Sequence, residues 1–167
     1  LTNLGSIELS TGNQQEGLSL LIKATESDSK LAPAWINLAN GYNKLNQYQD
    51  AEISIRKAIS LQPNFYNTHL ILGNILLSQK KYQEAEIEFR RTIELKPDLS
   101  AVYLNLGTVL IKQDKCTEAE KILRKSIEIN SNSFEAYYNL SKILEKNKKL
   151  EEAVIALKQA IYLKPSL

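Results

Sequence analysis

The sequence of 167 residues lacks methionine and contains a single cysteine, a single histidine and a single tryptophan. One cysteine cannot form an internal disulfide. Together with one histidine it cannot complete a Cys/His zinc site or the histidine pair of a metalloprotease. We therefore expect no bound metal, no cofactor and a reducing, cytoplasmic environment. Because an initiator methionine is also missing, we expect the chain to be a piece of a longer protein.

The chain also lacks an excess of charge and a long apolar run. Its 21 lysines and arginines stand against 19 acidic residues, and the net charge of +2 is too small to attract nucleic acid or an anionic membrane. The most apolar stretch, Leu70–Leu77, is far shorter than the roughly 20 apolar residues that a membrane span needs. Neither nucleic acid nor membrane is therefore expected as a partner. Paired cations such as Arg90 and Arg91, set among glutamates such as Glu86, predict a solvated helix surface.

What the chain does contain is an internal repeat of 34 residues that runs from end to end without insertion or deletion. It predicts a single array over residues 1–167, in which the first block lacks its opening three residues. The blocks are residues 1–31, 32–65, 66–99, 100–133 and 134–167. We call residues at the same place in successive blocks a column. One column is all leucine, and a small residue follows each member: Leu4, Leu38, Leu72, Leu106 and Leu140.

Each block predicts two antiparallel α-helices, because small and large apolar residues recur at offsets of three and four along its second half. In the block 66–99 we expect helices at residues 67–79 and 83–95, with a turn between them and Pro97 after the second. An acidic column should lie in the first turn of each second helix, where negative charge favours the helix dipole. Its members are Glu16, Asp50, Glu84, Glu118 and Glu152.

Local capping signals accompany these expected helices. Asn64, Asp98 and Asn132 follow the end of a second helix and are expected to cap the next helix. Thr117 and Glu120 have the spacing of a capping box, which predicts the start of a second helix at Thr117.

The block 32–65 contains the motif Trp35-x-x-Leu38-Ala39-x-x-Tyr42, then Tyr48-x-x-Ala51, Ala58 and Pro63. This pattern resembles the tetratricopeptide repeat, whose period is also 34, and the resemblance covers the whole chain. It implies a right-handed superhelical α-solenoid of stacked helix pairs, with first helices lining a concave groove and second helices covering the convex back. It also implies that Trp35 is buried between helices. Pentatricopeptide repeats, which bind RNA, are one residue longer, so the strict period argues against them.

No set of residues assembles a catalytic site, so we expect no enzyme activity from this chain. His69 shares its column with Trp35, Tyr103 and Tyr137, and is expected to fill the slot between helices that an aromatic ring fills elsewhere. Cys116 shares its column with tyrosines and is expected to be a small buried hydrophobe.

The implied groove gives the candidate binding residues. A column of mostly apolar side chains would alternate there with asparagines, whose amides both donate and accept hydrogen bonds and can bind the backbone of an extended peptide. The candidates are Ile36, Asn40, Leu70, Asn74, Leu104, Asn105, Thr108, Tyr138, Asn139 and Lys142. An alternative for each of these asparagines is that it only ties adjacent helices together, and this alternative is favoured at positions 37, 105 and 139 over positions 40 and 74.

One family function can be tested residue by residue. The clamp by which chaperone-binding members hold an acidic C-terminus needs Lys, Asn, Asn, Lys and Arg across three repeats. In the best register, all three cations are missing from the corresponding positions here: Leu70, Asn74, Asn105, Glu135 and Asn139. We therefore expect the ligand to be a neutral or apolar extended peptide.

Three functions remain open from the sequence. The favoured one is a non-catalytic scaffold that binds a protein partner, as an extended peptide or helix, in the groove. The second is a substrate-recruiting arm of a larger enzyme, for example a glycosyltransferase, whose catalytic domain lies outside this chain. The third is end-to-end self-association, because no polar helix follows the last repeat and Leu157 and Ile161 are expected to be exposed.

Overall fold

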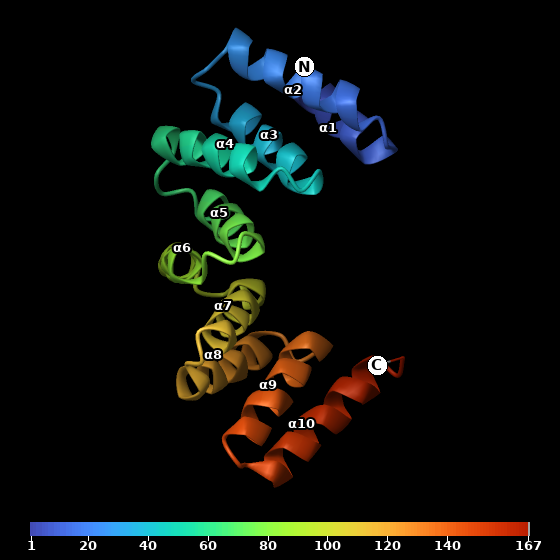
Figure 1. The fold of residues 1–167 in the computed structure, drawn as a ribbon, viewed down its shortest axis with the longest axis vertical. Coiled ribbons are helices and arrows are strands. Elements are labelled where there is room, and N and C mark those ends of the chain that lie inside the picture. Colours follow the sequence, from blue (N-terminus) through green and yellow to red (C-terminus); the bar gives the residue numbers. More distant parts are fainter. Residues whose placement is uncertain (167) are drawn as a thin grey trace. The chain divides into compact units, whose positions relative to one another are not determined.

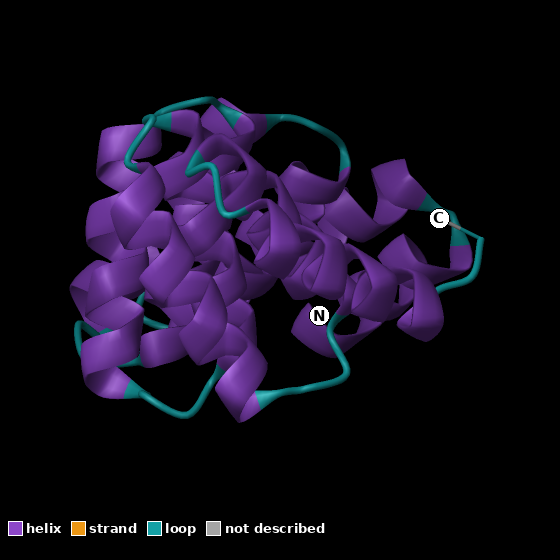
Figure 2. Ribbon diagram, turned by 90° about the horizontal axis from the view of Figure 1, so that it is seen from below, coloured by secondary structure: helices purple, strands orange, loops and turns teal. Residues whose placement is uncertain are grey.

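The structure is a computed structural model that describes residues 1–166. In this range the chain forms ten α-helices and no strand (Figure 1, Figure 2). The helices are α1 (Thr2–Thr11), α2 (Gln14–Ser27), α3 (Ala32–Lys44), α4 (Tyr48–Leu61), α5 (Tyr66–Ser78), α6 (Tyr82–Leu95), α7 (Ser100–Lys112), α8 (Cys116–Ile129), α9 (Phe134–Lys146) and α10 (Leu150–Leu163). The predicted all-α fold is confirmed, and α5 and α6 each lie within one residue of the expected bounds. None of these helices combines the length and the apolar character needed to cross a membrane.

The chain divides into two compact units at the turn between α5 and α6. The first unit, Leu1–Lys81, holds α1 to α5, and consecutive helices pack on each other. The second unit begins at Tyr82 and holds α6 to α10 in the same kind of stack. First helices of successive pairs also touch: α3 contacts α1 and α5 in the first unit, and α7 contacts α9 in the second.

The core is built from the columns that the sequence analysis singled out. Leu21, Ile55, Phe89 and Leu123 occupy one column of the second helices and are completely buried. The small residue after each column leucine lets the two helices of a pair approach closely. At Gly107 an added β-carbon would lie 2.6 Å from Leu123 Cδ2, so a larger residue at this contact would require the Leu123 side chain to move.

The turn inside each pair uses one left-handed residue in a single column: Gly12, Asn46, Lys80, Asp114 and Lys148, with φ between 59° and 98°. The residue after it donates its backbone N–H to the carbonyl oxygen five residues earlier, as Lys149 N does to Leu144 O at 2.8 Å. This is the Schellman arrangement that ends a helix. A lysine carries a steric cost in this conformation that glycine does not.

The loops between pairs are held by the aromatic column. Trp35 Nε1 donates to Ser29 O at 3.0 Å, His69 Nε2 lies 2.8 Å from Pro63 O, and Tyr103 Oη donates to Pro97 O at 2.8 Å. The prediction that His69 fills an aromatic slot is confirmed, since it is buried and makes the contact of its column. Trp35 is half-buried and packs against the core residues Leu9, Leu21 and Leu38, so the expectation that it is buried between helices is confirmed only in part.

Three local predictions are also wrong. The N-caps of α5, α7 and α9 are Phe65, Leu99 and Ser133, each one residue after the expected cap. Among these three only the Ser133 side chain bonds its helix, with Oγ accepting from Ala136 N at 3.2 Å. Thr117 lies inside α8, which begins at Cys116, and Glu120 points to other partners. Cys116 is half-buried rather than buried, with Sγ 3.7 Å from Asp114 Oδ1.

A polar clasp joins successive repeats on the second helices, and the sequence analysis missed it. In each clasp a glutamate accepts from an arginine one turn later in its own helix and from an amide and a lysine of the following repeat. The sets are Glu52 with Arg56, Gln79 and Lys81; Glu86 with Arg90, Gln113 and Lys115; and Glu120 with Arg124, Asn147 and Lys149. The prediction of a solvated surface is therefore wrong for Glu86, whose side chain is only 13% exposed.

The clasp changes the acidity of its glutamates. Burial alone would raise the pKa of Glu86, but hydrogen bonds from Lys115, Arg90 and Gln113 outweigh it and lower the pKa to about 2. The pKa of Glu120 is also about 2, because Lys149, Arg124 and Asn147 outweigh burial in the same way. Each folded-state pKa lies below that of a free glutamate, so the clasp stabilises the fold at neutral pH and is lost on acidification.

We expect Lys148→Gly to be more stable than Lys148→Ala by about 1 kcal/mol, because only glycine adopts the left-handed turn without a steric cost. Urea denaturation followed by circular dichroism measures the difference. Equal stability of the two variants would show that this turn stores no strain.

We expect the urea midpoint of the wild type to fall as the pH drops from the glutamate range near 4.5 towards 2, the interval in which Glu86 and Glu120 become protonated. The double variant Glu86→Gln with Glu120→Gln should lose most of this slope and about 2 kcal/mol of stability at neutral pH. Glu94→Gln, a change at an exposed pair with Arg91, is the matched control and should keep the slope. A double variant with the wild-type pH profile would contradict the role of the clasp.

Candidate peptide-binding groove

The first helices of the first unit enclose a hollow between α1 and α3, with a volume of about 220 Å³. It exists because Gly41 stands in a column that otherwise holds isoleucine or valine. A β-carbon at Gly41 would lie 2.9 Å from Leu9 Cδ1, so the two helices approach closely beneath the hollow. The residues that line it are Ser6, Leu9, Asn37, Asn40, Gly41 and Lys44.

The polar groups of this hollow differ in how free they are to bind a ligand. Asn40 is exposed, and within residues 1–166 its side chain takes part in no hydrogen bond. Lys44 Nζ donates to Leu9 O at 2.5 Å, which places a cation at the C-terminal turn of α1, where it favours the helix dipole. Asn37 also lines a second hollow of about 350 Å³, near the start of α1, together with Asn3.

The other predicted groove residues of the first unit are less accessible. Ile36 is only 9% exposed and belongs mainly to the core. Leu70 and Asn74 on α5 are half-buried, which leaves part of each side chain for a ligand. Asn40 is therefore the one exposed member of the predicted set in the first unit.

In the second unit the predicted residues lie on α7 and α9, which contact each other. Asn139 Nδ2 donates to Thr108 Oγ1 at 3.3 Å, and Thr108 Oγ1 donates to Leu104 O at 3.0 Å. Lys142 Nζ lies 4.2 Å from the centre of the Tyr138 ring, a cation–π contact on one turn of α9. Asn139 thus ties α9 to α7, and its amide oxygen keeps its capacity to accept a hydrogen bond.

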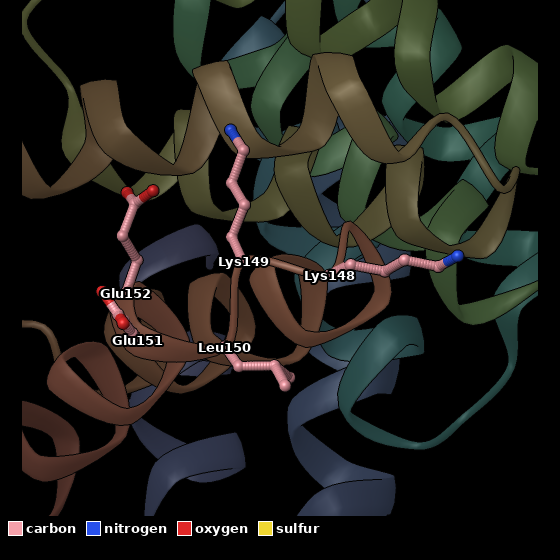
Figure 3. Close-up of a pocket in the computed structure, with 5 residues that line it drawn as sticks. All are labelled: Lys148, Lys149, Leu150, Glu151 and Glu152. Carbon is pink, nitrogen blue, oxygen red and sulfur yellow. The ribbon is translucent and has the colours of Figure 1, made fainter.

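The turn between α9 and α10 carries a separate hollow of about 360 Å³ (Figure 3). Lys149 and Glu152 extend towards the neighbouring α8, whereas Lys148 points away from them (Figure 3). Lys149 Nζ lies 2.7 Å from Glu120 Oε1, and Arg124 Nη2 lies 2.6 Å from Glu152 Oε2. Two of the four charges of this hollow, those of Lys149 and Glu152, are therefore committed to the stacking of repeats, and it is a weaker candidate for a binding site.

Within the described part of the chain, no three His, Cys, Asp or Glu side chains gather as a metal ion would require. Leu9 and Lys44 also line the hollow between α1 and α3, and neither was predicted from the sequence. The signal that could have found them is Gly41, because a glycine in a β-branched column marks a space between two helices.

Comparison with known proteins identifies the repeat. The chain matches the tetratricopeptide repeat family over residues 32–65, and over residues 78–160 it matches the family of subunit 3 of the anaphase-promoting complex, or cyclosome. No curated protein sequence matches the chain.

Solved structures show the same fold. MamA from Desulfovibrio magneticus RS-1 superposes with a TM-score of 0.91 at 18% identity, covering 98% of this chain and 93% of that one. YrrB, described as a TPR protein with an unusual peptide-binding site, gives a TM-score of 0.84 at 22% identity, covering 99% and 85%. PilF of Pseudomonas aeruginosa gives 0.87 at 26% identity, covering 96% and 73%. The predicted solenoid fold is confirmed, and the family matches over residues 32–65 and 78–160 show repeats of the tetratricopeptide type in this chain.

Proposed function

We propose that this chain is a non-catalytic scaffold that binds a protein partner, as an extended peptide or helix, along the face formed by the first helices of its repeats. The observation that carries the proposal is the hollow between α1 and α3, where the exposed amide of Asn40 stands beside the apolar Leu9. An amide beside an apolar hollow can hydrogen-bond a peptide backbone while the hollow takes a side chain. YrrB, which shares the fold, is itself described as having a peptide-binding site.

The second unit supplies a similar combination of groups for the same kind of ligand. Tyr138 and Lys142 offer an aromatic ring with a cation over it, and Leu104 adds an apolar side chain on the neighbouring helix. These groups suit a peptide of little net charge, in line with the missing cations of the chaperone clamp. We place this activity in the cytoplasm, with neither nucleic acid nor membrane as a partner. A role as the recruiting arm of a larger enzyme would use the same face.

We expect Asn40→Arg to weaken peptide binding at least about tenfold, because a large charged side chain would fill the hollow and remove the amide. The measurement is isothermal titration calorimetry with a peptide selected on the wild-type chain from a random phage-displayed library. Gln49→Arg is the matched control, since it adds the same side chain at an exposed position on α4, away from the hollow. Equal affinity of Asn40→Arg and wild type for the selected peptide would refute the proposal.

Self-association is the second candidate, and the exposure of the last repeat favours it. Leu157 is 38% exposed, whereas the other four members of its column are completely buried. Val154 stands where three earlier repeats carry the clasp glutamate, so the polar groups of the clasp are replaced here by an apolar surface. An apolar hollow of about 350 Å³ lies over this face, between Ser141 on α9 and Leu157 on α10.

We expect light scattering to show a concentration-dependent dimer that Leu157→Glu abolishes, because a carboxylate cannot be buried on this face without a partner. Ile155→Glu is the matched control. Ile155 is more exposed, at 68%, but shares a column with the equally exposed Ile53 and Ile87 and so lies outside the stacking face. A chain that stays monomeric at every concentration would exclude self-association.

A further inference from the structure

Two arginines bridge successive repeats in the second unit. Arg90 Nη2 lies 2.5 Å from Glu118 Oε1, and Arg124 Nη2 lies 2.6 Å from Glu152 Oε2. In both cases an arginine on one second helix binds the acidic residue in the first turn of the next second helix. Both acids belong to the column that was assigned to the helix dipole, so Glu118 and Glu152 also serve as arginine acceptors.

Between the first and second repeats the acid is kept but its arginine is missing. Asp50 occupies the acidic column, but the residue that should supply its arginine is Ile22. The clasp glutamate is also replaced, by Leu18, and the amide that would bind that glutamate is replaced by Leu45. Because the glutamate, the arginine and the amide of the clasp are all replaced by apolar residues at this interface, the polar clasp is lost. Asp50 remains without the arginine that its column binds in later repeats.

A hollow of about 290 Å³ lies at this place on the first unit. Thr25 stands there in a column that holds isoleucine in the other four repeats, and the smaller side chain leaves space beside the half-buried Trp35. The residues that matter for its chemistry are Ile22, Glu26, Trp35, Tyr42 and Asp50. On α3 this hollow uses residues 35, 38 and 42, whereas the peptide-binding groove uses residues 37, 40 and 44, so the two lie on opposite sides of that helix.

The charges at this hollow have no internal partner. Across residues 1–166, the carboxylates of Glu26 and Asp50 take part in no ion pair. Burial and the negative charge of Asp50 raise the pKa of Tyr42, which shows that this charge acts on the wall of the hollow.

We propose that this hollow binds an arginine side chain of a partner protein. The guanidinium takes the place that Arg90 and Arg124 occupy in the later repeats, with Asp50 and Glu26 as acceptors. Its planar, weakly hydrated face suits a wall of Trp35 and Tyr42 better than the compact ammonium of lysine does. The site is separate from the peptide-binding groove and does not depend on it.

Trp35 is the only tryptophan of the chain, so its fluorescence reports on this hollow alone. We expect the peptide acetyl-Gly-Arg-Gly-amide to change the Trp35 emission in a saturable way. The citrulline peptide, which has the same shape without the charge, should do so at least about tenfold more weakly, and the lysine peptide should lie between the two. An equal response to the arginine and citrulline peptides, or no saturable response to either, would overturn the proposal.

Variants locate the site. Asp50→Asn should weaken binding of the arginine peptide about tenfold, and Ile22→Arg should abolish it by supplying the missing arginine from within the chain. Glu118→Gln is the matched control, because that acid already holds Arg90, and it should bind as the wild type does. Asn40→Arg should also bind normally, which separates this site from the groove. Folding of each variant is checked by circular dichroism. Binding by Asp50→Asn and Ile22→Arg that matches the wild type would place the response elsewhere and refute the assignment.

Discussion

A helix pair of 34 residues cannot bury its apolar face by itself, and the rest of this structure depends on that constraint. Leu21, Ile55 and Leu123 each belong to one second helix, and each is completely buried only because the next element of the stack covers it. The one member of this column that is exposed, Leu157, belongs to the last repeat. The core is therefore a property of interfaces between neighbours, which explains why the sequence keeps a strict period.

The same constraint explains why the polar interactions cluster between successive repeats. A stack of identical apolar faces has no fixed register, and the clasps of Glu52, Glu86 and Glu120 add directional hydrogen bonds between one repeat and the next. Positions where the pattern breaks are then free for another use. Gly41 opens a hollow on one side of α3, and the exchange of arginine for Ile22 leaves acceptors on the other side. Both candidate binding sites of the first unit are departures from the repeat.

Much of the fold could be predicted from the sequence because helix content, turn positions and core columns all follow from the period. The bounds of α5 and α6 were within one residue, and His69 was correctly placed in its aromatic slot. Capping was predicted less well, since among the described N-caps only Ser133 bonds its helix through the side chain, and the left-handed turns that end the first helices were not predicted. Two of these turns have lysine at the left-handed position, and the backbone preferences of lysine do not predict a positive φ.

The binding residues could be predicted only in part, because exposure depends on which side chains the neighbouring helix covers. The column that contains Ile36 suggested an apolar groove wall, yet α1 and α5 both pack on α3 and leave Ile36 largely buried. Asn139 was left between a structural and a binding role, and its bond to Thr108 gives the structural role direct support. The clasps were not predicted because their partners from the following repeat lie 27 to 29 residues away in the sequence. At that separation the residue types can be read from the sequence, but not which side chains touch.

Binding of a peptide by the first helices through their asparagine amides is tested most directly by nuclear magnetic resonance of the ¹⁵N-labelled chain, with assigned side-chain amides, during titration with a library-selected peptide. We expect the Asn40 and Asn37 amide resonances to shift as the peptide binds, together with backbone signals of α3. Shifts confined to the second helices, with both asparagine amides unchanged at saturation, would contradict it.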